Sequence, residues 1–186
     1  MQRQLAELVD SLEKAQARLR QLSDTISKEA WARRPGPESW SAADCVEHLN
    51  LTSSAYLPLL RDASAEARLL GATSRSRYRQ DALGWFLSQM IGPMHHLGRF
   101  RIGKVKTTSD FVPRGGRSAD QLLSEFVRLQ SDLISLIRSA DGLPLDRVKI
   151  VSPFGGRMKY NAYSALVVVA RHQHRHIDQA EEASGR

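Results

Sequence analysis

Apolar residues recur at helical spacing in four long stretches of the chain. Over residues 2–29 they fall mostly three or four positions apart from Leu5 to Ile26, so they share one face of an amphipathic helix. The same spacing predicts three more long helices, over residues 41–70, 118–140 and 161–183. Four such helices in 186 residues indicate an all-α fold, a four-helix bundle formed by a single domain over residues 1–186.

Local signals mark where two of these helices begin. Ser41 is followed three positions later by Asp44, and Ser118 by Gln121, which is the pattern of a capping box. Pro58 falls inside the second predicted helix, where its ring predicts either a kink or an early end.

The connections between the helices differ in length. Residues 31–40 hold two prolines and a glycine and predict a loop, and residues 146–160 favour a short pair of strands. Residues 71–117 are too long for a hairpin loop, and they include a predicted short helix over residues 81–91. We expect its apolar side chains to pack over one end of the bundle; they are Trp85, Phe86 and Met90. Exposed apolar residues over 83–94 would also suit the subunit interface of a homodimer.

The composition, with 41% hydrophobic and 25% charged residues, is that of an ordinary soluble protein. No apolar run approaches the roughly 18 residues of a membrane span, and the charged, amphipathic N-terminus does not have the pattern of a secretory signal. The single cysteine, Cys45, cannot form an internal disulfide. We therefore expect a cytoplasmic protein with no membrane partner.

The net charge of +7 is concentrated in one segment. Residues 71–117 contain nine lysines and arginines but only Asp81 and Asp110 as acids, whereas the segments on either side are close to neutral. Such a segment could bind nucleic acid, attract an anionic substrate or form a solvated loop. The solvated loop is favoured, and nucleic acid is disfavoured because no DNA-binding motif and no interleaved aromatic residues accompany the charge.

Two of the six histidines share one helix face. His172 and His176 lie one turn apart on the inward side of the last helix, while His174 is expected to face solvent. Buried imidazoles need a partner, and a divalent metal ion satisfies them. His48, on the inward side of the second helix, is the natural third ligand, and Cys45 one turn earlier is a less favoured alternative. The competing interpretation is a pair of hydrogen-bonded core histidines.

The positions of these histidines constrain the directions of the helices. His48 lies near the start of the second helix, and the other two lie past the middle of the fourth. Parallel helices would displace the groups by roughly 10 Å at about 1.5 Å per residue, whereas antiparallel helices bring them together. A crossing by residues 71–117 allows this arrangement and gives an up-down-down-up bundle.

Around these residues the sequence resembles the DinB-like (DinB/YfiT-like) family of metal-dependent enzymes. The matching pieces are WSAADCVEHLN over residues 40–50 and SPFGGRMKYNAYSALVVVARHQHRHIDQAE over residues 152–181. They contain a Trp-Ser start to the second helix and a final H-x-x-x-H-x-x-Q pattern, formed here by Trp40, Ser41, His48, His172, His176 and Gln179. The resemblance implies a four-helix bundle whose three histidines hold a divalent ion, zinc or nickel. Gln179, one turn after His176, is either a residue that hydrogen bonds to one of the histidine ligands or a polar residue at the bundle end.

The resemblance also implies a function. A three-histidine ion with open positions lowers the pKa of a bound water or thiol. We therefore expect an enzyme acting on a small molecule, either a hydrolase or a transferase using a low-molecular-weight thiol, as some relatives do. Many relatives have acidic residues after the second-helix histidine where this chain has Leu51 and Ser53, and Glu47 should face away, so no catalytic carboxylate is assigned. The alternative is a non-catalytic bundle acting as a dimer or a nucleic-acid-binding module.

Overall fold

The computed structural model describes residues 1–71, 73, 77–92, 96–97, 100–101, 107–155 and 157–185. Helices dominate these ranges, and the strands are short. In chain order the elements are α1 (Arg3–Thr25), α2 (Lys28–Ala32), α3 (Ala42–Leu69), α4 (Ala82–Met90), β1 (His96–Leu97), β2 (Phe100–Arg101), the 3-10 turn η1 (Ser109–Phe111), α5 (Ala119–Ser139), β3 (Lys149–Val151), β4 (Lys159–Asn161) and α6 (Ala162–Ser184).

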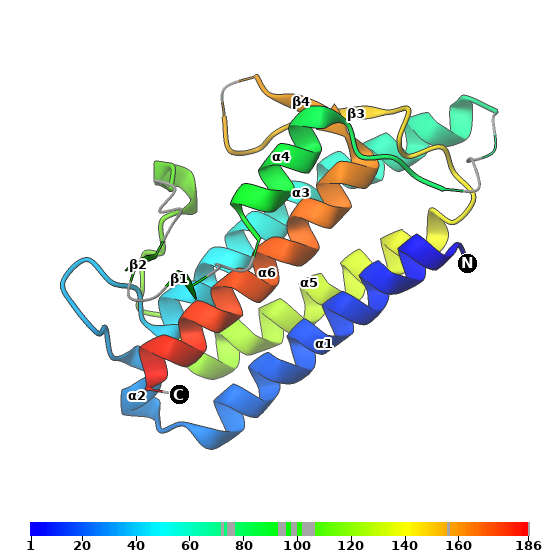
Figure 1. The fold of residues 1–186 in the computed structure, drawn as a ribbon. Helices are drawn as coiled ribbons and strands as arrows, with labels where there is room; N and C mark the ends of the chain where they lie inside the picture. Colours follow the sequence, from blue (N-terminus) through cyan, green and yellow to red (C-terminus); the bar gives the residue numbers. More distant parts are fainter. Residues whose placement is uncertain are drawn as a thin grey trace.

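The four long helices α1, α3, α5 and α6 pack side by side as a bundle, which confirms the predicted all-α fold (Figure 1). Helices α1 and α6 run in the same direction, because Ser11 contacts His174 and, further along both helices, Arg18 contacts Glu181. Helices α3 and α5 run the opposite way (Figure 1). The order is therefore up-down-down-up, with the segment between α3 and α5 crossing the bundle, as the histidine positions predicted.

The N-terminal region differs from its prediction in one respect. Helix α1 ends at Thr25 rather than at residue 29, and the short helix α2 forms partly within the stretch predicted as a loop. The hydroxyl of Ser27 accepts a hydrogen bond from the backbone N–H of Ala30 and so caps α2. This helix buries Trp31 in the core, and burial of that one large ring explains why a five-residue helix is stable here.

Both predicted capping boxes are present at the starts of α3 and α5. At α3, the Ser41 hydroxyl accepts from the backbone N–H of Asp44 while the Asp44 carboxylate accepts from the backbone N–H of Ser41. Pro58 does not end α3, which continues for eleven residues to Leu69. Leu57 and Leu60, on either side of the proline, are buried in the core, and this packing outweighs the backbone hydrogen bond that proline cannot make.

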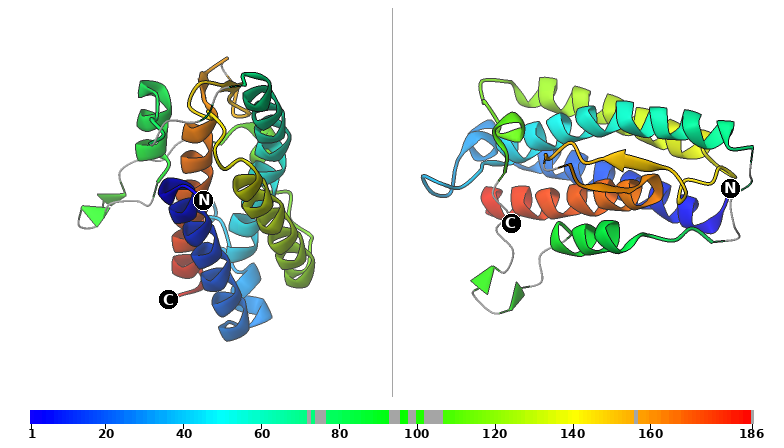
Figure 2. Two further views of the ribbon diagram at one scale, coloured as in Figure 1. Left: turned by 90° about the vertical axis from the view of Figure 1, so that its right-hand side faces the viewer. Right: turned by 90° about the horizontal axis from the view of Figure 1, so that it is seen from above.

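Helix α4 forms as predicted but packs elsewhere. It lies along α6 rather than over an end of the bundle (Figure 2). The residues that face α6 are small: a Cβ atom added to Gly84 would overlap Ser164. Trp85 and Phe86 point away and are 55% and 52% exposed, so the expectation that they pack on the bundle is wrong. The homodimer that these side chains would suit stays a prediction.

The strand pair expected within residues 146–160 is also present. Strands β3 and β4 are antiparallel, with Ile150 opposite Tyr160, and the hairpin that they form lies across α3 and α6 (Figure 2). The two-residue pair β1 and β2 was not expected. The β3–β4 hairpin matters for function because it brings Tyr160 and the turn before it next to the centre of the bundle.

Within the described residues, the core consists of two apolar clusters separated by a polar layer. One cluster occupies the half of the bundle where α6 begins, and the other occupies the half where α6 ends. Between them lie buried polar side chains, including Gln130 and Gln173, whose amides hydrogen bond to each other. The histidines belong to this layer. In the described ranges, no helix has the length and apolar content that crossing a membrane requires.

Candidate metal centre

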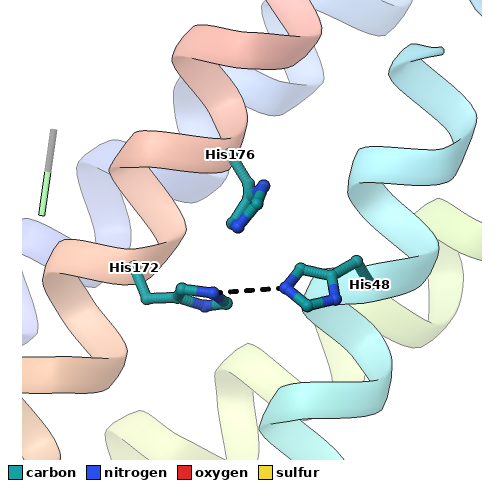
Figure 3. Close-up of side chains that lie close together, drawn as sticks. All are labelled: His48, His172 and His176. Atoms are coloured by element: carbon teal, nitrogen blue, oxygen red, sulfur yellow. Dashed lines mark hydrogen bonds between the residues drawn. The ribbon is translucent and has the colours of Figure 1, made fainter. Parts of the chain in front are cut away.

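Three imidazoles converge between α3 and α6 (Figure 3). His48 comes from the second turn of α3, and His172 and His176 come from successive turns of α6. One ligand nitrogen from each ring lies within 4.8 Å of the others, and all three side chains are buried. The antiparallel packing of α3 on α6 produces this convergence, because it places the beginning of one helix beside the later turns of the other.

Hydrogen bonds fix the direction in which two of the rings present their lone pairs. His48 Nδ1 lies 2.8 Å from the carbonyl oxygen of Phe111, which can only accept, so Nδ1 carries the proton and Nε2 has the lone pair. His176 Nδ1 lies 3.0 Å from Gln179 Oε1, which imposes the same tautomer. His48 Nε2 is 3.2 Å from His172 Nε2. Both Nδ1 bonds resemble the supporting contacts that orient histidine ligands in metal sites.

All three imidazoles are neutral at physiological pH. Burial lowers the pKa of His48 from 6.5 to about 4, against the opposing effect of the Phe111 carbonyl. Burial lowers the pKa values of His172 and His176 well below 6.5, and the neighbouring imidazoles and Arg175 lower them further. Neutral imidazoles are the form that ligates metal ions, so the site needs no proton loss at neutral pH before an ion can bind.

The donor set fits a divalent ion such as zinc or nickel. Nitrogens bound to one tetrahedral ion at about 2.0–2.1 Å lie roughly 3.3 Å apart, which is the separation that the His48–His172 pair already has. The widest nitrogen separation is at most 4.8 Å, so closing it takes a combined movement of at most about 1.5 Å. The three histidines therefore suit one ion, and among the described residues no cysteine or carboxylate joins the group.

Aromatic rings pack around the cluster. The centroid of Trp40 is 4.8 Å from that of His48 and 5.7 Å from that of His176. Phe154, in the turn between β3 and β4, lies 6.0 Å from His172. These rings restrict the rotation of the imidazoles and keep solvent away from them, which accounts for the strong effect of burial on their pKa values.

The imidazoles form one part of the wall of a cavity of about 210 Å³. Side chains from α3, α4, α6, the β3–β4 hairpin and the segment before η1 surround it. Most of them are apolar or aromatic. The lining residues are His48, Tyr56, Leu87, Ile91, Thr107, Thr108, Ser152, Phe154, Met158, Tyr160, Val168, His172, Arg175 and His176. A cavity of this size holds a small molecule beside the three nitrogens.

A group of hydroxyls forms another part of the cavity wall. Tyr56, two turns after His48 on α3, and Tyr160 on β4 hydrogen bond to each other through their hydroxyls, and Ser152 hydrogen bonds to both. Burial raises the pKa of both tyrosines above 10, and the proximity of Tyr160 raises that of Tyr56 further. The phenols therefore stay protonated and can donate hydrogen bonds to a bound molecule.

Other side chains considered in the sequence lie elsewhere. Cys45 is buried in the apolar cluster toward the end of α6 and does not belong to the histidine group. Glu47 does face away, as expected, and its carboxylate accepts from the backbone N–H of Gly115. The expectation that His174 is solvent-exposed is wrong, because it is partly buried against α1, where its Nε2 contacts the hydroxyl and carbonyl of Ser11.

The long crossing segment contributes directly to this centre. Leu87 in α4 and Ile91 directly after it line the cavity, as do Thr107 and Thr108 before η1, and the Phe111 carbonyl hydrogen bonds to His48. Its basic residues do not form a single patch where their side chains are described: Arg77 and Arg79 precede α4, whereas Arg114 and Arg117 precede α5 at the opposite end of the bundle (Figure 1). The side chains of the other five, Arg75, Arg99, Arg101, Lys104 and Lys106, lie outside the described part.

The sequence predicted that the three histidines meet, but it did not predict most of the groups that surround them. Arg175 lies at the i+3 position between His172 and His176 on the inward stripe of α6, and a charged residue at such a position was a visible signal. Tyr56, eight residues after His48, continues the same face of α3 and could have been found by periodicity. The carbonyl of Phe111 carried no signal, since any residue there would supply it.

Comparison with known proteins gives one match. A family model described as the DinB superfamily matches residues 11–180. No curated protein and no solved structure matches the chain. The matched range contains all of the residues that form the histidine centre and its cavity.

Proposed function

This chain belongs to the DinB superfamily, and on that basis we propose that it is a divalent-metal-dependent enzyme acting on a small molecule. The ligands are His48, His172 and His176, and the ion is zinc or nickel. When bound, the ion would supply Lewis acidity that makes a nucleophile of water or of a low-molecular-weight thiol at neutral pH. The reaction is then either a hydrolysis or a thiol-dependent S-transfer.

One observation carries this proposal. Three neutral imidazoles meet at the wall of a cavity, and acceptors behind two of them hold their Nε2 lone pairs in place. Three buried histidines that served only to fill space would cost stability without a compensating partner for each nitrogen. The same histidines next to a cavity have the arrangement of a catalytic metal site, which keeps positions open for substrate.

The other lining groups have separate tasks. The apolar walls exclude bulk water and so strengthen polar interactions inside the cavity. The protonated hydroxyls of Tyr56 and Tyr160 can donate to an oxygen of the substrate and so orient it relative to the imidazoles. Gln179 accepts from His176 and holds that ring in the ligating tautomer.

Metal content of the purified protein, measured by emission spectrometry, tests the ligand assignment. We expect about one ion per chain after incubation with zinc or nickel, and a loss of at least tenfold in affinity for His172→Ala. His174→Ala is the matched control, because it removes an imidazole two positions away that contacts α1 instead. A wild-type protein that takes up neither ion would refute the proposal, and equal loss in both variants would refute the assignment of His172.

The reaction class requires a substrate screen. Turnover of an electrophile that depends on added thiol would identify an S-transferase, whereas turnover of esters or amides without thiol would identify a hydrolase. Either activity should disappear with a chelator and return with the ion. Metal binding with no turnover in either screen would favour a non-catalytic role for the bundle.

A further inference from the structure

Three buried hydroxyls in the cavity wall form a connected cluster of hydrogen-bond donors. The phenols of Tyr56 and Tyr160 bond to each other, and the Ser152 hydroxyl bonds to both. The backbone N–H of Phe154 donates to Ser152 Oγ at 3.3 Å and so brings a further proton to the cluster. Every member of this hydroxyl cluster (Tyr56, Tyr160 and Ser152) carries a proton to donate, so none of them is an acceptor only.

The geometry of the hydroxyl cluster leaves room for an acceptor in the cavity. If all three hydroxyl protons stay within the triangle, each oxygen must donate and accept in directions much closer together than its proton and lone pairs prefer. An acceptor that enters the cavity can take one of these protons in a straight hydrogen bond and leave the other two in a chain. The oxygen that suits this position is one that accepts without donating, as a carbonyl oxygen does.

The surroundings of the hydroxyl cluster favour an uncharged oxygen. Burial keeps both phenols protonated, and the nearby Asp81 carboxylate raises the pKa of Tyr160 further. Asp81 is held in place because its carboxylate accepts from the backbone N–H groups of Gly84 and Asn161. An anionic oxygen bound to Tyr160 would lose its hydration and would also be repelled by Asp81, whereas a neutral carbonyl oxygen pays neither cost.

The hydroxyl cluster and the imidazoles line different stretches of the same cavity. Tyr56 lies two turns after His48 on α3, and Tyr160 lies before the start of α6, whose later turns carry His172. Apolar side chains complete the wall near them, among them Leu87 and Val168. A molecule with its carbonyl oxygen at the hydroxyl cluster can therefore extend an apolar body toward the histidines.

We propose that the substrate of this site is a small molecule with an uncharged carbonyl group, whose oxygen accepts a hydrogen bond from the hydroxyl cluster while its apolar body extends toward the three histidines. The inference rests on the proposed function only for the word substrate, because the hydrogen bond does not require the metal ion. An alcohol is disfavoured because its hydroxyl would add one more donor to a cluster that already consists of donors.

Acetophenone and α-methylstyrene are suitable probes, because they share a shape and differ only in a C=O or a C=CH2 group. Each is titrated into the metal-free full-length protein by calorimetry, so that neither can bind through an ion. The hydrocarbon has the larger hydrophobic driving force, so the response of each probe to a variant is the informative quantity. At least one of Tyr56→Phe and Tyr160→Phe should weaken acetophenone by about fivefold or more, and α-methylstyrene by less than about twofold.

Tyr163→Phe is the matched control. It removes a phenol hydroxyl that bonds to Gln4 and does not line the cavity, so the affinities of both probes should stay within about twofold. Acetophenone affinity that is unchanged in both cluster variants, or an equal loss for both probes, would overturn the proposal, as would a wild-type protein that binds neither probe. Tighter wild-type binding of 1-phenylethanol than of acetophenone would overturn the carbonyl assignment, and this comparison needs no variant to fold.

The outcomes separate this inference from the proposed function. Zinc or nickel uptake by a protein whose acetophenone affinity does not depend on the hydroxyl cluster leaves the metalloenzyme proposal intact and refutes only the carbonyl site. Acetophenone binding that depends on the hydroxyl cluster, in a protein that takes up neither ion, supports the carbonyl site and refutes the metalloenzyme proposal.

Discussion

Acidification should destabilise the metal-free protein well above the pH at which carboxylates titrate. An unfolded chain protonates His48 near its ordinary pKa of 6.5, whereas burial holds the pKa in the folded protein at about 4. Between these two values the unfolded state binds more protons than the folded state, so stability falls as the pH falls. Above pH 6.5 the imidazole is neutral in both states and the pH dependence from His48 vanishes.

The difference between these two pKa values sets the size of the effect. For His48 alone, the free energy of unfolding should drop by about 2 kcal/mol between about pH 7.5 and pH 5. His172 and His176 act in the same direction, because burial lowers their pKa values well below 6.5. Titration of Asp44 does not contribute to this drop. Its burial raises its pKa, but hydrogen bonds from Arg34 and Ser41 outweigh that effect and hold the pKa below 3.8.

Urea unfolding followed by circular dichroism, in the presence of a chelator, measures this drop. His48→Asn is the informative variant, because an asparagine amide can still donate to the Phe111 carbonyl but does not titrate. Its free energy of unfolding should fall by about 2 kcal/mol less than that of the wild type over the same pH range. A wild-type stability that stays level down to pH 5, or an equal fall in the variant, would show that the imidazole is not buried as described.

Three further predictions concern the supports of the site and the packing of the bundle. Gln179→Ala should weaken metal binding by about 10- to 100-fold in a competition assay with a chelating dye, and unchanged affinity would mean that the glutamine does not hold the ring. Gln130→Leu should lower the free energy of urea unfolding by about 2 kcal/mol, because it leaves the buried Gln173 amide without its partner. Changing both glutamines to leucine should restore part of that loss, whereas additive losses from the two single variants would contradict the pairing. Gly84→Ala should lower the melting temperature, since overlap with Ser164 costs about 1–3 kcal/mol and exceeds the gain in helix propensity of about 1 kcal/mol; a higher melting temperature would show that α4 does not pack closely on α6.

The long helices could be predicted because the apolar residues that stabilise them in the core recur every three or four positions in the sequence. Both capping boxes could be predicted because each consists of two residues only three positions apart. The direction of α3 relative to α6 followed from asking where His48 could meet His172 and His176. For the helices and the capping boxes the physical cause is local or periodic, so the sequence shows it directly. The helix directions instead followed from the requirement that three histidines share one ion.

The misjudged features depend on contacts between segments that are distant in the sequence. The position of α4 is decided by close approach of Gly84 to Ser164, which no local pattern reveals. His174 lies on the side of α6 away from the other two histidines, but α1 covers that side. Helical periodicity identifies a face, but it does not say which neighbour covers that face.

His48 and His172 are separated by 124 positions in the chain. Contacts of such high sequence separation require the largest loss of chain entropy and tend to form late in folding. A fragment that stops short of α6 would retain three helices of the bundle and a single imidazole of the set. Neither a nascent chain nor a C-terminally truncated one can therefore assemble the three-nitrogen centre, which confines its chemistry to molecules in which α6 has docked.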